Sequence, residues 1–191
     1  LGLPLTHGTA PRCVLCGEYA DVMGTHALSC MKGGGKTRAH NAVRDTLFEL
    51  CSYALMTPAK EVRFGTSGKR MDIVITIGPT QFLIDVALIM PTLTNHALAA
   101  STSPGMAATA YEGVKHREYP PSQLSSFQTL IPFIIDMFGA YGASCKPFLG
   151  RLAKAYSGRF GSRLGGPLLF SRLNVAVTRA ASSLAASALG L

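Results

Sequence analysis

The sequence has few acidic side chains and few charged residues of any kind. Only 10 of its 191 residues are Asp or Glu, against 18 Lys and Arg, and charged residues make up 15% of the chain. Hydrophobic residues make up 48%, so the chain can bury a sizeable core, which excludes an intrinsically disordered protein. The length suits one good-sized domain, or one domain with an appendage.

The sequence also lacks a long apolar run. No stretch reaches the roughly 20 residues that a membrane-spanning helix needs, and no signal peptide is recognisable. We therefore expect no membrane partner. The chain begins with "LGLPL" rather than with Met, which suits a piece of a longer polypeptide.

Acids are scarcest in the C-terminal part. After Glu118 a single acid, Asp136, accompanies seven basic residues, and the formal net charge of the chain is +8. The seven are Lys146, Arg151, Lys154, Arg159, Arg163, Arg172 and Arg179. A basic surface of this kind attracts polyanions, nucleic acid first and anionic membrane second. A soluble basic protein without such a partner remains the alternative.

The five cysteines are unevenly placed. An odd number, clustered near the N-terminus, argues against a disulfide framework and for a metal site in a reducing compartment. Cys13 and Cys16, followed by His26 and Cys30, form a Cys3His set that suits tetrahedral Zn2+. We expect a structural zinc, because four protein ligands leave no open coordination position.

Two alternatives to this ligand set stay open. Two of the clustered cysteines could be ordinary buried residues, and His40 could replace one of the ligands. The remaining cysteines, Cys51 and Cys145, are expected to be simple core residues.

The pattern of apolar residues predicts a mixed α/β (α+β) fold with the order α-β-β-β-α-β followed by C-terminal helices. Helices are expected over 37–55, 106–119, 145–160 and 167–189, and strands over 60–64, 70–77, 82–90 and 129–139. Thr37 is the expected N-cap of the first helix, and "GPTQ" predicts a hairpin turn. Residues 92–105, rich in Ser, Thr and Ala, are expected to form a loop.

The same pattern predicts three parts along the chain. Residues 1–36 form a zinc knuckle, residues 37–160 form the α-β-β-β-α-β core, and residues 161–191 form a helical extension.

Two aspartates interrupt the apolar runs of the predicted hairpin. Asp72 and Asp85 are expected on adjacent antiparallel strands, where ionised carboxylates are costly to bury and repel each other. Mg2+ or Mn2+ would remove both problems, and the carbonyl of Val86 could add a ligand. Such a site can activate a water and stabilise the charge on a phosphodiester. Otherwise Asp72 would pair with Arg70 or a backbone amide.

Such a site also needs a cationic side chain close to the attacking water or the scissile phosphate. Lys115, on the helix after the sheet, is the candidate, and Tyr119 follows at i+4 on the same face. Glu61 is a weaker candidate for an additional metal ligand.

Four further basic residues are candidates for contacts with a nucleic-acid backbone. Lys69 and Arg70 lie close to Asp72 and could contact phosphate. The alternative is that they are ordinary charged residues at a hairpin turn. His40 and Arg44 lie one helical turn apart and could contact DNA or link the knuckle to the core. A solvated helix face explains them equally well.

Taken in order, these motifs resemble the C-terminal part of early-branching, site-specific non-LTR retrotransposon polyproteins. The motifs are the Cys-x-x-Cys…His…Cys knuckle, the helix with His40 and Arg44, "RMD", "IDVALIMP" and "AATAYEGVKHREY". That part is a zinc knuckle followed by a restriction-like endonuclease of the PD-(D/E)xK superfamily. The resemblance covers roughly Cys13 to Tyr156. Each motif alone is weak, and the specificity lies in their order and spacing.

The resemblance implies a restriction-endonuclease-like core and a Mg2+- or Mn2+-dependent DNA endonuclease. Such an enzyme nicks genomic DNA in the nucleus and exposes a 3′ end for target-primed reverse transcription. Its partners are DNA and the reverse transcriptase domain of the same polyprotein.

The resemblance also assigns residues by position. Asp72 matches the aspartate of the "PD" step, Asp85 the acid of the third strand, Lys115 a lysine on the following helix, and Tyr119 a tyrosine that often follows it. Ala87 stands where the usual D-x-K lysine would be, so Lys115 would have to replace it or the site is inactive.

A second departure is that Met71 stands where the superfamily often has a proline, and that proline contributes no ligand.

A catalytically silent nucleic-acid-binding or scaffold domain of the same fold is the main alternative, and a zinc-knuckle protein-interaction module is a weaker one. The sequence has no helix-turn-helix or finger array, so target choice is expected elsewhere in the parent protein.

Overall fold

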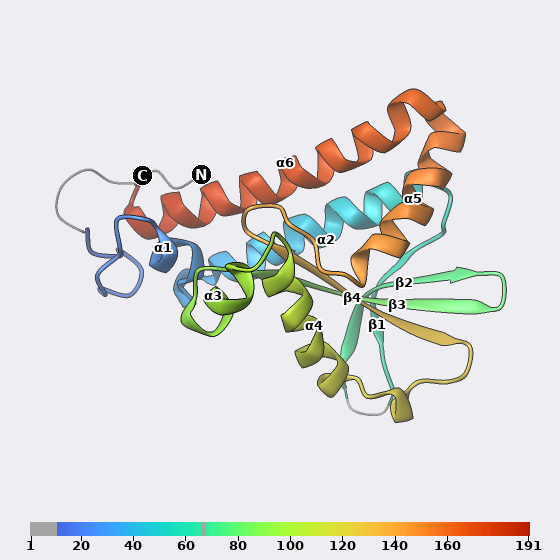
Figure 1. The fold of residues 1–191 in the computed structure, drawn as a ribbon, viewed down its shortest axis with the longest axis horizontal. Coiled ribbons are helices and arrows are strands. Elements are labelled where there is room, and N and C mark those ends of the chain that lie inside the picture. The colour runs from blue at the N-terminus through green and yellow to red at the C-terminus, as the bar shows by residue number, and fades with distance from the viewer. Residues whose placement is uncertain (1–10, 66–67) are drawn as a thin grey trace.

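The computed structural model describes residues 11–65 and 68–191, and its centre is a four-stranded mixed sheet with helices on both faces (Figure 1). The strands are β1 (Ala59–Arg63), β2 (Arg70–Ile77), β3 (Thr80–Ile89) and β4 (Gln128–Asp136), in the order β1-β2-β3-β4. The helices are α1 (Thr25–Ser29), α2 (Gly35–Tyr53), α3 (Thr94–Ala100), α4 (Met106–Glu118), α5 (Cys145–Phe160) and α6 (Ser162–Leu189). Two 3-10 turns, η1 (Lys32–Gly34) and η2 (Pro121–Gln123), complete the order.

The sheet combines a meander with one crossover. β1, β2 and β3 are consecutive antiparallel strands, and Ile77 pairs with Thr80 across the expected turn at Gly78, whose φ of 58° favours glycine. α4 then carries the chain to β4, which pairs with β3 in parallel. The predicted mixed α/β fold is confirmed at this level.

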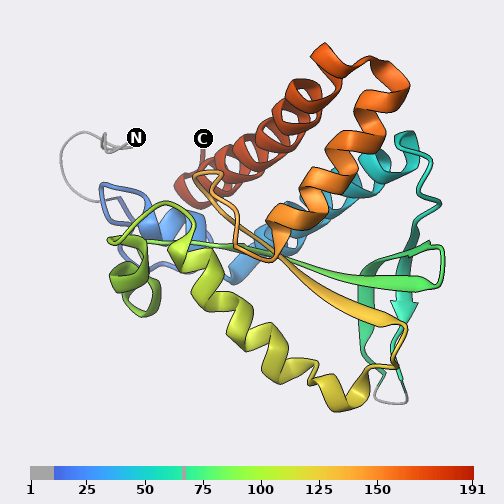
Figure 2. The same ribbon diagram turned by 45° about the vertical axis from the view of Figure 1, so that its right-hand side comes forward.

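The main hydrophobic core lies between one face of the sheet and the helices α2, α5 and α6. Val43, Leu47 and Leu50 of α2 are fully buried because they repeat at helical spacing on one side. α4 covers the other face, where Ala107 and Ala108 pack against Ile89 and Ile134. Figure 2 shows α5 and α6 on the opposite side of the sheet from α4.

Three local predictions were wrong. Thr37 is not an N-cap, because α2 begins at Gly35 and Gly34 occupies the capping position with a φ of 68°. The expected loop over 92–105 contains α3, which packs beside α4 through the His96 and Tyr111 rings at 5.6 Å. The last helix begins at Ser162, five residues before the expected start, although Gly165 and Gly166 disfavour a helix.

The chain segments at the two ends of the described structure lie side by side. The knuckle segment and α1 pack against the C-terminal end of α6, as Figure 1 shows near the label C. α6 also packs along α2 and α5 and belongs to the main core. The predicted boundaries at 36 and 160 stay predictions. None of the helices in the described part has the length and hydropathy needed to cross a bilayer.

Candidate functional site

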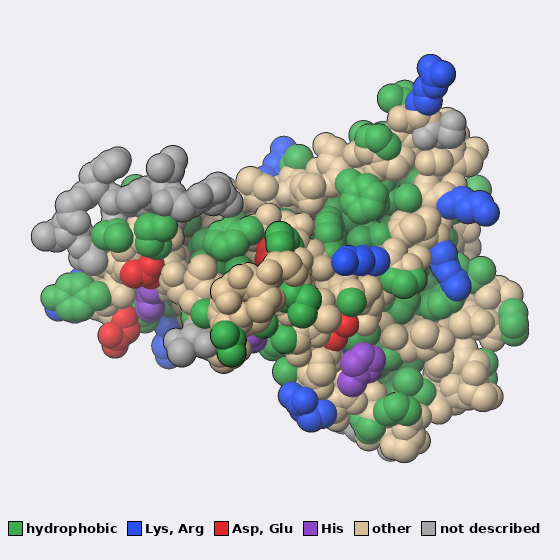
Figure 3. Space-filling model, in the orientation of Figure 1, with side chains coloured by type: hydrophobic (Ala, Val, Ile, Leu, Met, Phe, Trp, Pro, Cys, Tyr) green, Lys and Arg blue, Asp and Glu red, His purple; other side chains and the backbone are tan. Residues whose placement is uncertain are grey.

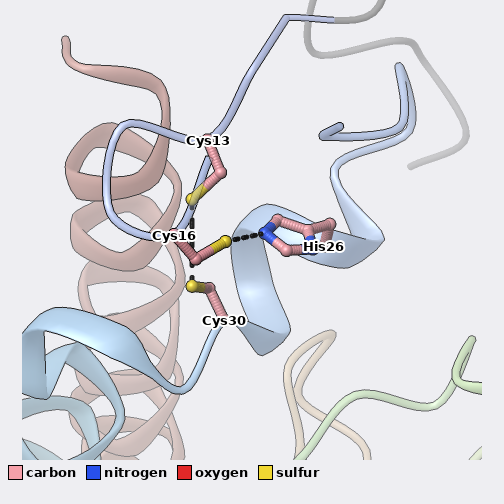
Figure 4. A group of neighbouring side chains, drawn as sticks. All are labelled: Cys13, Cys16, His26 and Cys30. Atoms are coloured by element: carbon pink, nitrogen blue, oxygen red, sulfur yellow. Dashed lines mark hydrogen bonds between the residues drawn. The ribbon is translucent and has the colours of Figure 1, made fainter. Parts of the chain in front are cut away.

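Four side chains near the N-terminus converge on one point (Figure 4). The Sγ atoms of Cys13 and Cys30 are 3.8 Å apart, and Cys16 Sγ lies 3.2 Å from His26 Nε2. All four ligand atoms lie within 4.8 Å of one another. Ligands at about 2.3 Å from a tetrahedral Zn2+ are separated by about 3.8 Å. The cluster can therefore bind a metal ion such as zinc, with the predicted residues.

Local hydrogen bonds hold this Cys3His cluster in place. The amide of Gly17 donates to the Cys13 carbonyl at 2.8 Å, closing the turn between the first two cysteines. Asp21 accepts hydrogen bonds from the amides of Thr25 and His26 at 3.0 and 2.7 Å, so it binds the first two amides of α1 and helps to position His26. The residue at the N-cap is Gly24, with a φ of 77°, so the sequence carries no capping side chain at the usual position.

The cluster has the chemistry of a metal-binding site. Burial raises the pKa of the Cys13 thiol, but hydrogen bonds, first from the Leu15 amide and then from His26, outweigh it and lower the pKa to about 6. A thiolate is the form that binds metal. His40 is not part of the cluster, so the open alternative ligand is wrong. Cys51 and Cys145 are buried away from it, as expected.

Asp72 and Asp85 come together where β2 and β3 separate. The pairing of β2 with β3 ends at Ile73 and Ile84, and the next position on each strand is an aspartate. Asp72 Oδ2 accepts a hydrogen bond from the Val86 amide at 2.7 Å, in place of a backbone partner. The expected convergence of the two aspartates is therefore present, and it is Val86's amide that contacts Asp72.

The β1–β2 hairpin is irregular at the same place. Glu61 lies opposite Asp72 in the register and has a φ of 54°, which is rare for a residue with a side chain. Beyond this point Met71 packs with Val74, although strict alternation would place it with Ile73. Strained backbone often accompanies functional sites, so this bend draws attention to Asp72.

Lys115 and Tyr119 reach Asp85 from the end of α4. Lys115 Nζ lies 2.9 Å from Asp85 Oδ2, and Tyr119 Oη donates to Asp85 Oδ1 at 3.3 Å. Lys115 also pairs with Glu118 at 3.1 Å. Lys115 and Tyr119, four residues apart, therefore lie on the same side as expected, although Tyr119 is the first residue after the helix.

The charges and the burial around Asp85 and Lys115 favour the binding of a further positive charge. Burial raises the pKa of the Asp85 carboxyl, and Asp72 and Glu118 raise it further, which together outweigh Lys115. The pKa of Lys115 lies above its usual range, because Asp85 and Glu118 outweigh the lowering effect of burial. Asp85 Oδ2 faces Lys115 but makes no hydrogen bond of good geometry within the described residues. A cation beside this oxygen would favour the ionised carboxylate.

His40 binds Asp72, a contact that the sequence did not predict. Its Nε2 lies 3.2 Å from Asp72 Oδ2, and the hydrogen bond raises the pKa of His40 although burial lowers it. The only available signal was its position one turn before Arg44 on the face of α2 that meets the hairpin.

The other predicted contact residues lie around this group. Arg44 forms ion pairs with Glu61 and with Asp45, and its side chain is only 12% exposed. Lys69 Nζ donates to the Glu118 carbonyl at 2.8 Å and lies over the Tyr119 ring. Arg70 is exposed at the start of β2. The predicted DNA contacts of these residues stay predictions.

Two buried acids outside the group have structural roles. Asp136, whose role the sequence left open, accepts hydrogen bonds from the Phe138 and Ala140 amides at 2.9 Å and forms the turn after β4. Glu112 binds the amide and hydroxyl of Ser144 at the start of α5.

No protein-family model matches the chain, and no curated protein is significantly similar to it.

Within the described residues, the Cys3His cluster is the only group of three or more His, Cys, Asp or Glu ligands close enough to hold a metal ion. In the described part of the chain, no third ligand residue therefore lies close enough to Asp72 and Asp85 to form such a group.

Proposed function

We propose that the chain is a metal-dependent DNA endonuclease with a restriction-endonuclease-like core. The observation that carries this proposal is the meeting of Asp72 and Asp85 on adjacent strands with Lys115 of α4, 2.9 Å from Asp85. Lys115 is remote from both aspartates in the sequence, and the sequence motifs indicate the same three residues. A pair of carboxylates, one of them buried, with a neighbouring lysine is the kind of constellation that hydrolyses phosphodiesters.

Each residue has a distinct part in this proposal. Asp72 and Asp85 would hold Mg2+ or Mn2+, which when bound activates a water and stabilises the charge on the phosphodiester. Tyr119 and Lys115 orient Asp85, and Lys115 offers positive charge beside the scissile phosphate. His40 and the Val86 amide fix the carboxylate of Asp72. Zinc in the Cys3His cluster would stabilise the N-terminal segment.

The biological setting follows from the resemblance. The enzyme would nick target DNA in the nucleus and expose a 3′ end for the reverse transcriptase domain of the same polyprotein. Lys69, Arg70, Arg44 and His40 lie around the aspartates and would contact the DNA backbone. Such contacts give affinity without sequence readout and depend strongly on salt.

The test is nicking of supercoiled plasmid with and without added Mg2+ or Mn2+. Asp72→Asn, Asp85→Asn and Lys115→Met should each lower the nicking rate by at least about a hundredfold, because each removes a group close to the reaction. Two exposed substitutions outside the site are matched controls, Glu49→Gln for the acids and Lys32→Met for the lysine. Their rates should equal that of the wild type.

Thermal unfolding of every variant separates loss of activity from loss of fold. Equal nicking by the wild type and all three site variants would contradict the assignment of the site. Absence of nicking by a folded, DNA-binding wild type would contradict the enzymatic function of this chain.

One observation favours a second candidate, a catalytically silent nucleic-acid-binding domain of the same fold. Both aspartates already have protein partners, Lys115 for Asp85 and His40 for Asp72. Such a domain would bind DNA with the same affinity whether or not Mn2+ is added, and Mn2+ would not raise its unfolding temperature. Metal binding to the enzyme would raise it.

A further inference from the structure

A small pocket opens next to the two aspartates, on a part of the sheet outside the main core. Its volume is about 210 Å3, and its floor is formed by Met71, Val74 and Leu83, which are at most 7% exposed. These three side chains pack with Phe64 and Tyr119, whose rings meet edge to face at 5.7 Å. Tyr119 in turn binds Asp85, so the apolar cluster that forms the pocket floor also contacts Asp85.

The rim of the pocket carries three side-chain amides, Gln81, Gln123 and Gln128, which are all the glutamines of the chain. Gln128 Nε2 donates to Gln81 Oε1 at 2.7 Å, and Gln128 Oε1 accepts from the Ser125 amide at 3.1 Å. Within the described residues, neither Gln81 Nε2 nor the side-chain amide of Gln123 has a hydrogen-bond partner. The pocket thus combines a closed apolar floor with free donors and acceptors at its edge.

A pair of arginines lies at the same end of the hairpin. Arg63 lines the pocket and is directly opposite Arg70 in the β1–β2 register. Like charges at directly opposite positions destabilise a sheet. Neither arginine forms an ion pair with an acid among residues 11–65 and 68–191. An anion at this place would relieve the repulsion, and phosphate suits paired arginines.

We propose that this pocket binds one unpaired nucleobase of a nucleic-acid strand, with an adjoining phosphate at Arg63 and Arg70. The apolar floor would pack against the base, and the glutamine amides would bind its polar edge, as in pockets that receive flipped or single-stranded bases. The volume is below the roughly 300–1,000 Å3 of drug-sized ligand sites, so it fits a planar base rather than a whole nucleotide.

The inference rests on the proposed nuclease function for its ligand class, and it adds a substrate preference to that function. Met71 precedes Asp72 in β2, and Leu83 lies two residues before Asp85 in β3. A strand held by its base would therefore pass beside the aspartates. We expect the protein to prefer DNA with an unpaired base near the cut over a perfect duplex.

The test measures the affinity of the full chain by fluorescence anisotropy, without added Mg2+ or Mn2+, so that it does not depend on cleavage. The probes are a labelled single strand and a perfect duplex of the same sequence. The double variant Gln81→Met/Gln123→Met keeps the side-chain length and removes the free amides. It should bind the single strand about tenfold more weakly and bind the duplex as the wild type does.

Asn95→Met, an exposed amide on α3, is the matched control and should change neither affinity. Arg63→Gln should weaken binding to both probes and lower the salt slope by about one. Arg38→Gln, an exposed arginine on α2, is its control. Equal affinity of the double variant and the wild type for the single strand would overturn the proposal.

A measurement on the wild type covers the case in which the double variant does not fold. A single strand with one 2-aminopurine should show lower quenching by acrylamide when bound, because the base is enclosed. Unchanged quenching overturns the pocket, even if the nuclease assay succeeds. Protection in a protein that never nicks would support the pocket and refute only the enzyme.

Discussion

The five cysteines differ in what surrounds their sulfur atoms, and this difference is measurable. Cys51 and Cys145 are fully buried, and burial raises the pKa of each to about 12. Cys145 Sγ also lies 3.6 and 3.4 Å from the carbonyl oxygens of Pro132 and Ile134. Thiolates are the reactive form, so these two cysteines should stay unreactive in the folded protein at pH 8.

Counting reactive thiols therefore tests the Cys3His cluster. We expect no thiol to react in the native, metal-loaded protein, three after a chelator is added, and all five after unfolding. The three are Cys13, Cys16 and Cys30, which mass spectrometry of the alkylated peptides identifies. Three reactive thiols before chelation would contradict metal binding by the cluster.

The ion pair of Asp85 and Lys115 makes a second prediction for single residues. Lys115→Met leaves the Asp85 carboxylate buried without its cation and should lower the free energy of unfolding by about 2 kcal/mol. This is less than the roughly 3–5 kcal/mol for fully buried pairs, because the Lys115 side chain is 16% exposed. Urea unfolding at pH 7 measures the change.

A double variant separates the pair from packing. Asp85→Asn combined with Lys115→Met should lose less stability than the sum of the two single changes, because no charge is then left unpaired. Additive losses would mean that the two side chains contribute independently.

At the scale of elements, the crossing of α5 and α6 depends on one glycine. A Cβ at Gly165 would lie 2.4 Å from the Ser157 Cα and 2.7 Å from its amide nitrogen, so the two helices meet backbone to backbone. Gly165→Ala should therefore lower the free energy of unfolding by about 2 kcal/mol through overpacking. Thermal unfolding measures the loss.

The neighbouring glycine is the matched control. A Cβ at Gly166 meets no atom within 4 Å, so Gly166→Ala should stabilise α6 by about 0.5–1 kcal/mol through helix propensity. Equal effects of the two substitutions would show that α5 and α6 do not approach as closely as described.

Gly165 also shows why sequence patterns predicted some helices and strands and missed others. β2, β3, α4 and α5 were predicted nearly to the residue, because their apolar periodicity and flanking Gly or Pro agree with their packing. The start of α6 was missed because Gly165 opposes helix by propensity, and only the contact with α5 explains it. α3 was missed for the converse reason, since its short Ala-rich segment carries no apolar stripe.

Some contacts of the candidate site could likewise be predicted from the sequence, and others could not. Spacing alone predicted the Cys3His cluster, and the hairpin turn predicted that Asp72 and Asp85 would meet. The contact of His40 with Asp72 could not be predicted, because it depends on how α2 crosses the end of β2. The closeness of Lys115 to Asp85 was expected, but from the order of the elements and the resemblance rather than from spacing.

At the scale of the whole molecule, the Cys3His cluster joins the first and last described segments. The amide of Val14 donates to the carbonyl of Ala188 at 2.9 Å, and Ala188 is fully buried against Cys13, Ala27 and Cys30. A bound metal would thus stabilise the end of α6 as well as the knuckle, because both surround the same small core.

Removing the metal should therefore loosen two distant parts of the chain together and leave the sheet intact. With a chelator, amide exchange in residues 11–30 and 180–191 should become roughly tenfold faster or more, while β2 and β3 keep their protection. Cys16→Ala should give the same pattern without a chelator. Faster exchange in 11–30 alone would show that α6 holds its end without the knuckle. A uniform rise that includes the sheet would instead make the cluster essential to the whole fold, because the loss would then spread through the core that α6 shares with the sheet.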